Sequence, residues 1–114
     1  MADTIFDKII RKEIPADIIY EDEVAVAIKD INPQAPVHVL VLPTRKAANL
    51  TELATMDTEY AGEYLKRIAL ITEKLGLTSD GFRVVFNQGR YGQQSVEYLH
   101  AHILGGRQME WPPG

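Results

Sequence analysis

Hydrophobic residues recur at helical spacing in two parts of the chain. The first is residues 3–14, where Asp3 is placed to cap a helix and Pro15 to end it. The second lies between Asp57 and Gly76, and glycine is a favourable residue just beyond a helix. The apolar faces are Ile5, Phe6, Ile9 and Ile10 in the first segment, and Ala61, Tyr64, Leu65, Ile68, Ile71 and Leu75 in the second. We therefore predict one short and one long amphipathic helix.

Five other segments read as β-strands. An acidic turn at residues 21–23 separates two short strands, predicted at 17–21 and 23–30. Residues 37–42, between two prolines, are apolar almost throughout, which predicts burial on both faces. The last two strands, 81–87 and 96–104, flank the loop 88–95. Consecutive strands joined by short turns predict an α+β fold, with a mostly antiparallel five-stranded sheet and the helices on one side.

Length and composition indicate a single domain spanning residues 1–114. The net charge is −4 and no cluster of basic residues is present, which argues against a nucleic-acid partner. The absence of cysteine excludes disulfides and thiolate zinc sites. The N-terminal residues lack the apolar core of a signal peptide, and no stretch has the length of a membrane span. We expect an intracellular protein, cytoplasmic or nuclear, with no membrane partner.

Two of the three histidines, His100 and His102, lie one residue apart on the predicted strand 96–104. Alternation along a strand places them with Tyr98 on one face, while Leu99, Ala101 and Ile103 share the other. A lone histidine is most often structural, but two at this spacing suit a cleft. Imidazole can bind a metal, transfer a proton near neutral pH, or attack phosphorus as a nucleophile.

The loop that precedes the histidines favours a phosphate over a bare metal. The segment "NQGRYGQQS" is rich in glycine and small polar residues, so successive backbone N–H groups can form a concave anion site. Gln94 and Ser95 add side-chain donors. A glycine-containing loop is weak evidence by itself, and its position ahead of two histidines adds to it.

The segment "QSVEYLHAHILGGRQMEWPPG" resembles the histidine triad proteins, whose hallmark is His-φ-His-φ-His-φ-φ with φ apolar. The likeness is to the nucleotide-binding phosphoramidase branch, and it runs nearly end to end through "DTIFDKIIRKEIPA", "DINPQAPVHVLVLP" and "VVFNQG". Tyr98 occupies the position of the first triad histidine. Lys46 stands where the branch often carries a histidine.

The resemblance implies a purine nucleoside phosphoramidase that hydrolyses AMP– or GMP–amine conjugates. His100 carries over as the nucleophile that forms a nucleotidyl-histidine intermediate, and His102 as the group beside the phosphate or the leaving amine. The backbone carbonyl at Tyr98 would hold the second ring nitrogen of His100, so the tyrosine affects the rate and its pH dependence rather than the nucleophile. His38 would support the two histidines without being the reacting group. No cofactor is implied.

The resemblance also implies a nucleotide-binding set. Asp30 would bind the ribose hydroxyls, although a carboxylate here is otherwise an ordinary turn residue. Two further sets of residues complete the site. One is an apolar wall around the base, which could equally be ordinary core, and the other is a set of contacts to phosphate and ribose. The wall is Ile5, Phe6, Ile9, Ile28 and Ile31, and the contacts are Asn87, Gln93, Gln94 and Ser95. A mainly apolar pocket admits adenine and guanine alike.

A two-fold homodimer is a further implication, with the long helix and a sheet edge meeting their copies. The tail 105–114 would lie at the interface. Its Trp111, followed by two prolines, would then reach the cleft of the other subunit, although it could instead pack on its own domain.

Two alternatives stay open. A binding module that holds nucleotides or proteins with little turnover would account for Tyr98. A zinc protein would use His38, His100 and His102 and leave a fourth position open. Against zinc, Glu97 is the carboxylate nearest to the histidines in sequence, and strand alternation turns it to the opposite face.

Overall fold

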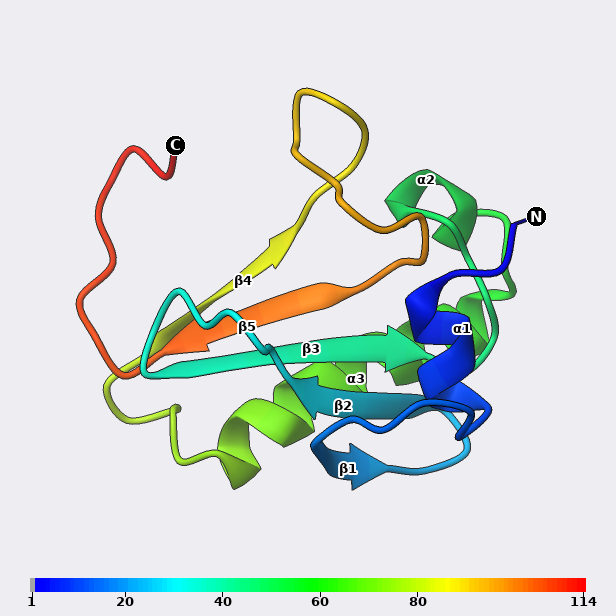
Figure 1. The fold of residues 1–114 in the computed structure, drawn as a ribbon. Helices are drawn as coiled ribbons and strands as arrows, with labels where there is room; N and C mark the ends of the chain where they lie inside the picture. The colour runs from blue at the N-terminus through cyan, green and yellow to red at the C-terminus, as the bar shows by residue number, and fades with distance from the viewer. Residues whose placement is uncertain (1) are drawn as a thin grey trace.

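A computed structural model describes residues 2–114, which fold into one five-stranded antiparallel sheet with three helices (Figure 1). This confirms the predicted α+β class and the five-stranded sheet. The strands are β1 (Ile18–Glu21), β2 (Ala25–Lys29), β3 (Val37–Pro43), β4 (Phe82–Phe86) and β5 (Ala101–Gly105). The helices are α1 (Ile5–Ile10), α2 (Leu50–Leu53) and α3 (Thr58–Lys74). The short α2 was not predicted.

The last strand of the sequence is an inner strand of the sheet. The spatial order is β1-β2-β3-β5-β4, so β5 lies between β3 and β4 and the edges are β1 and β4. On β5, His102 pairs with Leu40 of β3 on one side and with Val85 of β4 on the other. The histidine strand is therefore not a sheet edge, and its backbone groups are held by two neighbours.

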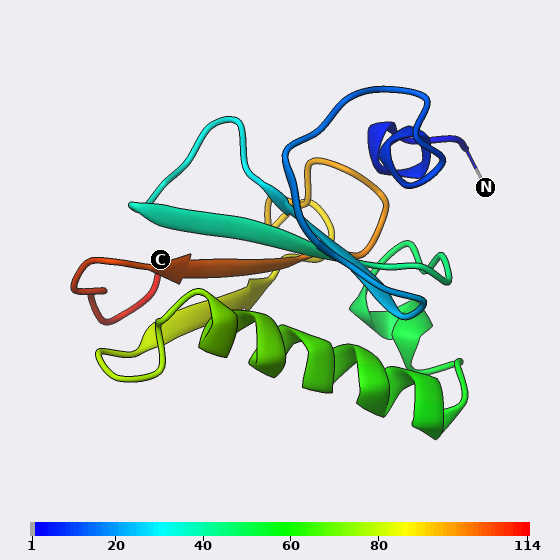
Figure 2. The same ribbon diagram turned by 90° about the horizontal axis from the view of Figure 1, so that it is seen from below.

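The helices cover opposite faces of the sheet, which corrects the prediction that they share one side. Figure 2 shows the sheet between α1 and α3. The reason is the apolar character of both faces of β2 and β3: a second apolar face must also be covered. The face toward α3 carries Ala25, Ala27, Val39 and Val41, and the face toward α1 carries Val26, Ile28, Leu40 and Leu42.

The long helix α3 is anchored by its buried tyrosines. The Asp57 side chain accepts a hydrogen bond from the Tyr60 N–H at 2.9 Å and caps the helix. Tyr64 is fully buried, and its hydroxyl donates to the Val41 carbonyl oxygen of β3 at 2.7 Å. Tyr60 belongs to this buried face, whereas Leu65, predicted to belong to it, is 51% exposed. The predicted face is otherwise confirmed, since Tyr64, Ile68 and Ile71 are buried and Ala61 and Leu75 pack against the same core.

The short helix α1 begins one residue later than predicted. Thr4, not Asp3, is the N-cap, and it forms a reciprocal capping box with Asp7. Asp3 instead pairs with Arg11 at the other end of the helix, at 2.8 Å. Phe6 and Ile9 are the buried residues that seat α1 on the sheet.

The strand predicted at 96–104 is only partly a strand. Its ladder begins at Ala101, because Leu99 donates its N–H to the Ala47 carbonyl oxygen at 2.7 Å rather than to a neighbouring strand. The predicted alternation nevertheless holds through the irregular part. Leu99, Ala101 and Ile103 pack in the core under α3, and Tyr98 packs in the cluster under α1.

Within residues 2–114, no helix combines the length and apolar character that crossing a bilayer requires.

Loss of the Tyr64 hydroxyl should weaken the contact between α3 and the sheet. We expect Tyr64→Phe to lower the free energy of unfolding by about 1–2 kcal/mol, because a buried hydrogen bond to the backbone is lost. The matched control is Tyr91→Phe, since Tyr91 is 93% exposed and should change stability by less than about 0.5 kcal/mol. Urea unfolding measures both, and equal values would contradict the anchoring role.

Candidate functional site

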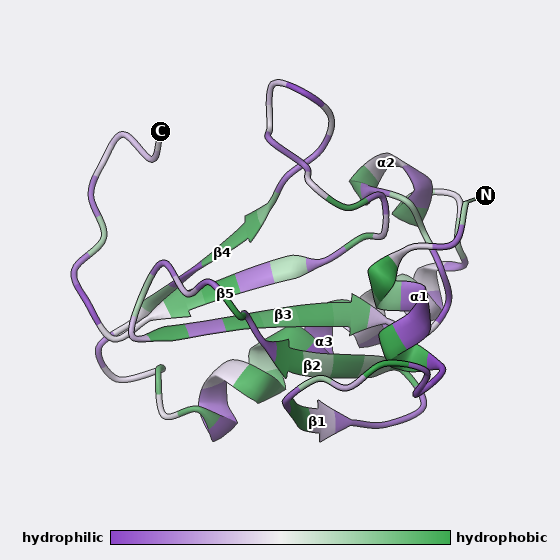
Figure 3. Cartoon of the chain, in the orientation of Figure 1, coloured by the Kyte–Doolittle hydropathy of each residue, from purple (hydrophilic) through white to green (hydrophobic). Residues whose placement is uncertain are grey.

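The three histidines lie on the face of the sheet that α1 partly covers. His38 is on β3, two residues from Leu40, which pairs with His102. His100 precedes β5 by one residue, and its ring lies edge-on to Phe6 of α1 at 5.0 Å between centroids. In Figure 3, hydrophilic colour interrupts the otherwise hydrophobic β3 and β5. The predicted placement of His100 and His102 on one face is what the structure shows.

The ring of His100 is oriented by a backbone carbonyl. Its Nδ1 lies 2.7 Å from the carbonyl oxygen of Tyr98, and because that oxygen can only accept, Nδ1 carries the proton. The lone pair of the neutral ring is therefore on Nε2. This nitrogen is available as a base or a nucleophile. The Tyr98 side chain packs in the cluster under α1, and its hydroxyl donates to the Pro43 carbonyl oxygen.

A second hydrogen-bond chain fixes the proton on His102. The Gln34 N–H donates to Nδ1 of His38 at 2.9 Å, so in the neutral ring Nε2 carries the hydrogen. His38 Nε2 lies 2.9 Å from His102 Nδ1 and donates to it. His102 consequently carries its own proton on Nε2, a buried atom with no hydrogen-bond partner within residues 2–114. An unpartnered buried N–H beside His100 is suited to an anionic oxygen.

Asp30 adds a carboxylate at the end of this chain. Its Oδ2 lies 3.4 Å from His38 Nε2, and its Oδ1 accepts the Asn32 N–H at 2.8 Å. The structure therefore brings the predicted ribose ligand next to His38. Asp30 is only partly buried, so this contact is compatible with a further partner on its outer side.

Burial keeps the histidines neutral. Removal from water lowers the pKa of His100 below its ordinary value, although the Tyr98 carbonyl acts in the opposite direction. Burial, together with the neighbouring His100 and His38, lowers the pKa of His102 to about 4. Burial also lowers the pKa of His38, against the influence of Asp30. The free protein at neutral pH thus presents a neutral Nε2 lone pair on His100 and a neutral N–H donor on His102.

The loop 88–95 is tied together by its own polar groups. The Gln94 amide donates to the Ala48 and Val96 carbonyl oxygens at 2.7 and 3.0 Å and accepts the Gly89 N–H. The N–H groups of Gln93 and Gln94 also bond within the loop. Gly92 is required here, because a Cβ at this position would lie 2.6 Å from the Gln88 carbonyl oxygen. Gln94 therefore fixes the loop, whereas the side chains of Gln93 and Ser95 are exposed.

The predicted wall around the base is only partly assembled. Phe6, Ile9 and Ile28 belong to one buried cluster under α1, in contact with Tyr98. Ile5 is half exposed, and Ile31 is 99% exposed on the turn after β2. The sequence left open whether these residues line a base site or form core. The three buried residues are part of the core, and they also lie next to the histidines.

Asn87 and the tail line a cavity of about 630 Å³ on the same face of the sheet. Val85, the β4 partner of His102, is part of its lining, as are Leu104, Arg83 and residues 112–114. Trp111 is 81% exposed, and its ring lies 5.9 Å from the guanidinium carbon of Arg83. The alternative in which Trp111 is buried against its own domain is therefore not what the structure shows.

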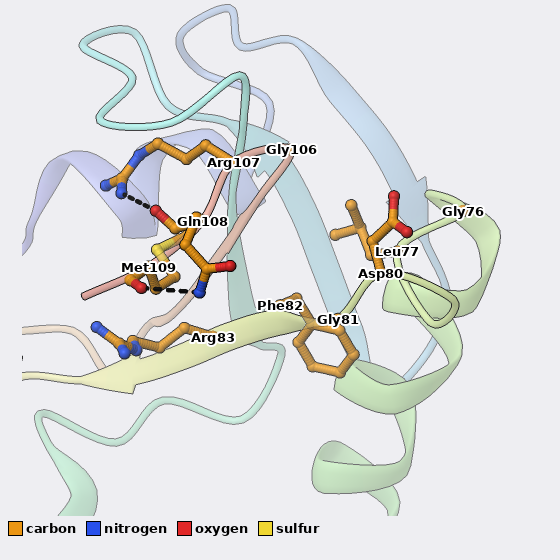
Figure 4. Close-up of a pocket in the computed structure, with 10 residues that line it drawn as sticks. All are labelled: Gly76, Leu77, Asp80, Gly81, Phe82, Arg83, Gly106, Arg107, Gln108 and Met109. Atoms are coloured by element: carbon orange, nitrogen blue, oxygen red, sulfur yellow. Dashed lines mark hydrogen bonds between the residues drawn. The ribbon is translucent and has the colours of Figure 1, made fainter. Parts of the chain in front are cut away.

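A second cavity, of about 750 Å³, lies away from the histidines. Figure 4 shows Arg83 and Arg107 on one side of it and Leu77, Asp80 and Phe82 on the other. It contains no histidine, and its lining comes from the residues between α3 and β4, the start of β4 and the residues after β5. We assign no chemistry to it.

The cluster with the spacing of a metal site is not the predicted one. Donor atoms of Asp30, His38 and His102 lie within 4.8 Å of one another, and His100 is not part of the group. Metal binding needs a lone pair on Nε2 of His38, but the Gln34 N–H occupies the lone pair on Nδ1 and so leaves the proton on Nε2. The residues present fit a hydrogen-bond chain and do not fit a zinc ion.

An ion pair next to the site was missed from the sequence, where Lys46 was noted only as standing in the place of a family histidine. Lys46 and Asp7 form an ion pair at 2.8 Å above Tyr98. Thr4 and Asp7 have the spacing of a capping box, which predicts that Asp7 lies in the first turn of α1. Nothing in the sequence connects position 7 with position 46, since that contact depends on the tertiary fold.

Comparisons with known proteins agree on one family. A family model described as "HIT domain" matches residues 11–109. A "14 kDa zinc-binding protein" of Zea mays is 51% identical over 97% of this chain and 88% of its own length. The "Adenylylsulfatase HINT1" of Arabidopsis thaliana is 44% identical over 97% of this chain and 76% of its own length. A solved HIT family hydrolase of Legionella pneumophila superposes with a TM-score of 0.92 at 41% identity, covering 98% of this chain and 100% of that one.

The lowered histidine pKa values predict that mild acid destabilises the protein. Unfolded histidine takes up its proton near pH 6.5, while folded His102 does so only near pH 4, so the unfolded state binds more protons between these values. The stabilisation is complete above about pH 6.5 and is lost as the pH falls. For His102 alone the free energy of unfolding should drop by about 2 kcal/mol between pH 7 and pH 5.

Urea unfolding at several pH values measures this slope. Working above about pH 5 keeps most carboxylates ionised in both states. His102→Asn removes one titrating ring and should flatten the profile. A wild-type stability that is constant between pH 7 and pH 5 would contradict the neutral, buried state of the cluster.

Proposed function

This chain belongs to the HIT domain family, and we propose that it is a hydrolase that cleaves the P–N bond of purine nucleoside 5′-phosphoramidates. The observation that carries the proposal is the orientation of His100. Its Nδ1–H is held by the Tyr98 carbonyl, so a neutral Nε2 is presented beside the N–H donor of His102. A nucleophile and a donor for anionic oxygens are the two groups that attack on phosphorus needs.

In the proposed first step, Nε2 of His100 forms a bond to the α-phosphorus. The P–N bond to the amine breaks, and the amine leaves with a proton. In the second step water attacks the same phosphorus and gives a proton to His102, the bond to His100 breaks, and the nucleoside monophosphate leaves. Imidazole suits both steps, because it attacks when neutral and departs readily when protonated. The Tyr98 carbonyl also favours the positive charge that the ring carries in the intermediate.

His102 is proposed to act on the phosphate and on the leaving amine. In the free protein it is neutral, so it donates a hydrogen bond from Nε2 rather than offering a full charge. An anionic phosphate beside the ring raises its pKa, since a nearby negative charge favours the protonated form. Substrate binding therefore favours a second proton on His102, and the cation then gives its Nε2 proton to the amine. In the free protein His38 keeps the single proton of His102 on Nε2, the nitrogen that would face the phosphate.

The nucleotide would lie between α1 and the loop 88–95. Phe6, Ile9 and Ile28 supply the apolar surface for a purine, and Asp30 is proposed for the ribose hydroxyls. Asn87, Gln93 and Ser95 are proposed to contact phosphate or ribose. An apolar wall supports adenine and guanine equally, so AMP and GMP conjugates are both proposed as substrates. An intracellular location is proposed with it, since nucleotides are abundant there.

A nucleotide-binding module with little turnover is the second candidate, and Tyr98 is the observation that favours it. The carbonyl that orients His100 belongs to the backbone, and replacement of the side chain leaves it in place. Burial raises the pKa of Tyr98 far above its usual range, so its hydroxyl stays a neutral donor and does not supply acid. Measurable hydrolysis of a phosphoramidate by the wild-type protein decides between the two candidates.

Removal of His100 should abolish hydrolysis and spare binding. We expect His100→Ala to lose at least about 10³-fold in turnover of an AMP phosphoramidate, because a removed nucleophile costs several kcal/mol of barrier. AMP affinity should stay within about tenfold of wild type. Steady-state kinetics and calorimetry test this on protein dialysed exhaustively against chelator, which also tests the metal alternative. A variant that keeps more than about a tenth of wild-type turnover would refute the assignment.

We also propose a two-fold homodimer joined through the edge strand β4. This strand has one unpaired side, and Phe82 at its start is 40% exposed. The tail 105–114 leaves the sheet beside β4 (Figure 1), where Arg83 donates to the Glu110 carbonyl oxygen at 2.9 Å and lies over the Trp111 ring. A two-fold axis at β4 would allow each tail to reach the other subunit, where Trp111 would contact the leaving group.

Light scattering should give twice the 12.8 kDa chain mass at micromolar concentration. Trp111→Ala should change the preference among leaving amines more than it changes AMP affinity, because the ring would lie on the amine side of the phosphorus. Kinetics over a series of amines measure the preference. A fully active monomer would exclude both the dimer and the role of Trp111.

A further inference from the structure

The N-terminal helix is held at one place by a half-buried ion pair. Lys46 Nζ, on the segment after β3, lies 2.8 Å from Asp7 Oδ2 and 2.8 Å from the Ala2 carbonyl oxygen. The side chains of Lys46 and Asp7 are 23% and 11% exposed. The pairs made by Arg11 and Lys12 near the end of α1 are about half exposed. Exposed pairs contribute little to stability, whereas the Lys46–Asp7 pair is shielded from water and salt.

Asp7 is the point at which three donors converge. Its Oδ2 accepts the Thr4 N–H at 2.7 Å, the Thr4 hydroxyl at 2.8 Å and the Lys46 ammonium. Burial acts to raise the pKa of Asp7, but these hydrogen bonds hold it below its ordinary value. The same carboxylate therefore caps α1 and binds it to the segment after β3.

Tyr98 lies beneath this ion pair. The Lys46 ammonium is 5.9 Å from the centre of the Tyr98 ring, and the Tyr98 hydroxyl bonds to Pro43, three residues before Lys46. The ring also meets Phe6 edge-on at 6.3 Å between centroids. Phe6 adjoins Asp7 in sequence and also meets the ring of His100 at 5.0 Å. The ion pair, Tyr98, Phe6 and His100 thus form one continuous set of contacts.

We propose that the Lys46–Asp7 ion pair is a latch that holds α1 over Tyr98 and thereby positions the ring of His100. His100 is fixed at two points: the Tyr98 carbonyl holds Nδ1, and the edge of Phe6 limits rotation of the ring. The Tyr98 carbonyl belongs to the backbone, whereas the position of Phe6 depends on the position of α1. Because α1 is only six residues long, its own hydrogen bonds hold it weakly, and its position depends on tertiary contacts. Lys46 and Asp7 are then positioning residues for the reaction, and this role rests on the proposed function.

The test compares two lysines that both anchor the α1 region to a carboxylate. Lys46→Met breaks the latch and leaves the Thr4–Asp7 cap in place. Lys12→Met breaks the exposed pair with Glu21, at 2.6 Å, and serves as the matched control. Lys46→Arg keeps the charge and tests rescue. The readouts are amide hydrogen exchange of residues 5–12 by mass spectrometry, and kcat and KM with an AMP phosphoramidate.

For Lys46→Met we expect exchange in residues 5–12 to quicken by about tenfold while exchange in α3 stays unchanged. We expect kcat to fall by about 3- to 30-fold, since a misplaced ring slows attack even at saturating substrate. KM should rise by a few-fold, because Phe6 and Ile9 also line the base site. Lys46→Arg and Lys12→Met should stay within about twofold of wild type in all three measurements.

The latch is overturned if Lys46→Met matches Lys12→Met in exchange, or if α1 loosens and kcat does not change. Equal acceleration of exchange in α1 and α3 also overturns it, since it would indicate a general loss of stability. If the wild-type protein hydrolyses no phosphoramidate, the proposed function fails and the positioning role fails with it, whereas the exchange data still decide whether the ion pair holds α1.

Discussion

The alternation of side chains along residues 98–103 is the constraint on which the other features depend. It sends Leu99, Ala101 and Ile103 into the core under α3 and turns the two histidines toward α1. A shift of one residue would bury both histidines under α3 and expose the apolar side chains, so core packing and site geometry are fixed by the same register. Pairing with β3 and β4 on both sides makes that register hard to change.

The five strands, the helices α1 and α3 and the face of the histidines were predictable because they rest on local periodicity, whereas the four-residue α2 is too short to show one. The prediction that both helices cover one face of the sheet was wrong, although the sequence contained evidence against it. The strand 37–42 was recognised as apolar on both faces, and two apolar faces need two covers. The helices were nevertheless expected on one side, because no local pattern states which face a short helix covers. α1 reaches its face through Phe6 and Ile9, whose partners lie on strands distant in sequence.

The proton positions in the site were not predictable beyond His100. The carbonyl of Tyr98 was expected from the family resemblance, and a carbonyl at that position is independent of the side chain. The Gln34 N–H that sets the tautomers of His38 and His102 is a backbone group on a turn, and no residue type in the sequence marks it. The Gln34–His38 hydrogen bond also leaves no free lone pair on His38 for a metal. Asp30, His38 and His102, although spaced like the ligands of a zinc site, are therefore better described as a chain of hydrogen bonds.

The contact of α1 with Tyr98 has a consequence for biosynthesis. Residues 5–10 leave the ribosome well before Tyr98, but the surface on which they settle includes Tyr98. The strand that follows Tyr98 must also insert between two strands already made. A nascent chain from which Tyr98 has not yet emerged therefore carries an undocked amphipathic helix and an uncovered apolar sheet face, which are the surfaces that chaperones bind. The histidine cluster is thus completed, and the apolar sheet face covered, only when residues 98–105 have been made and α1 can dock.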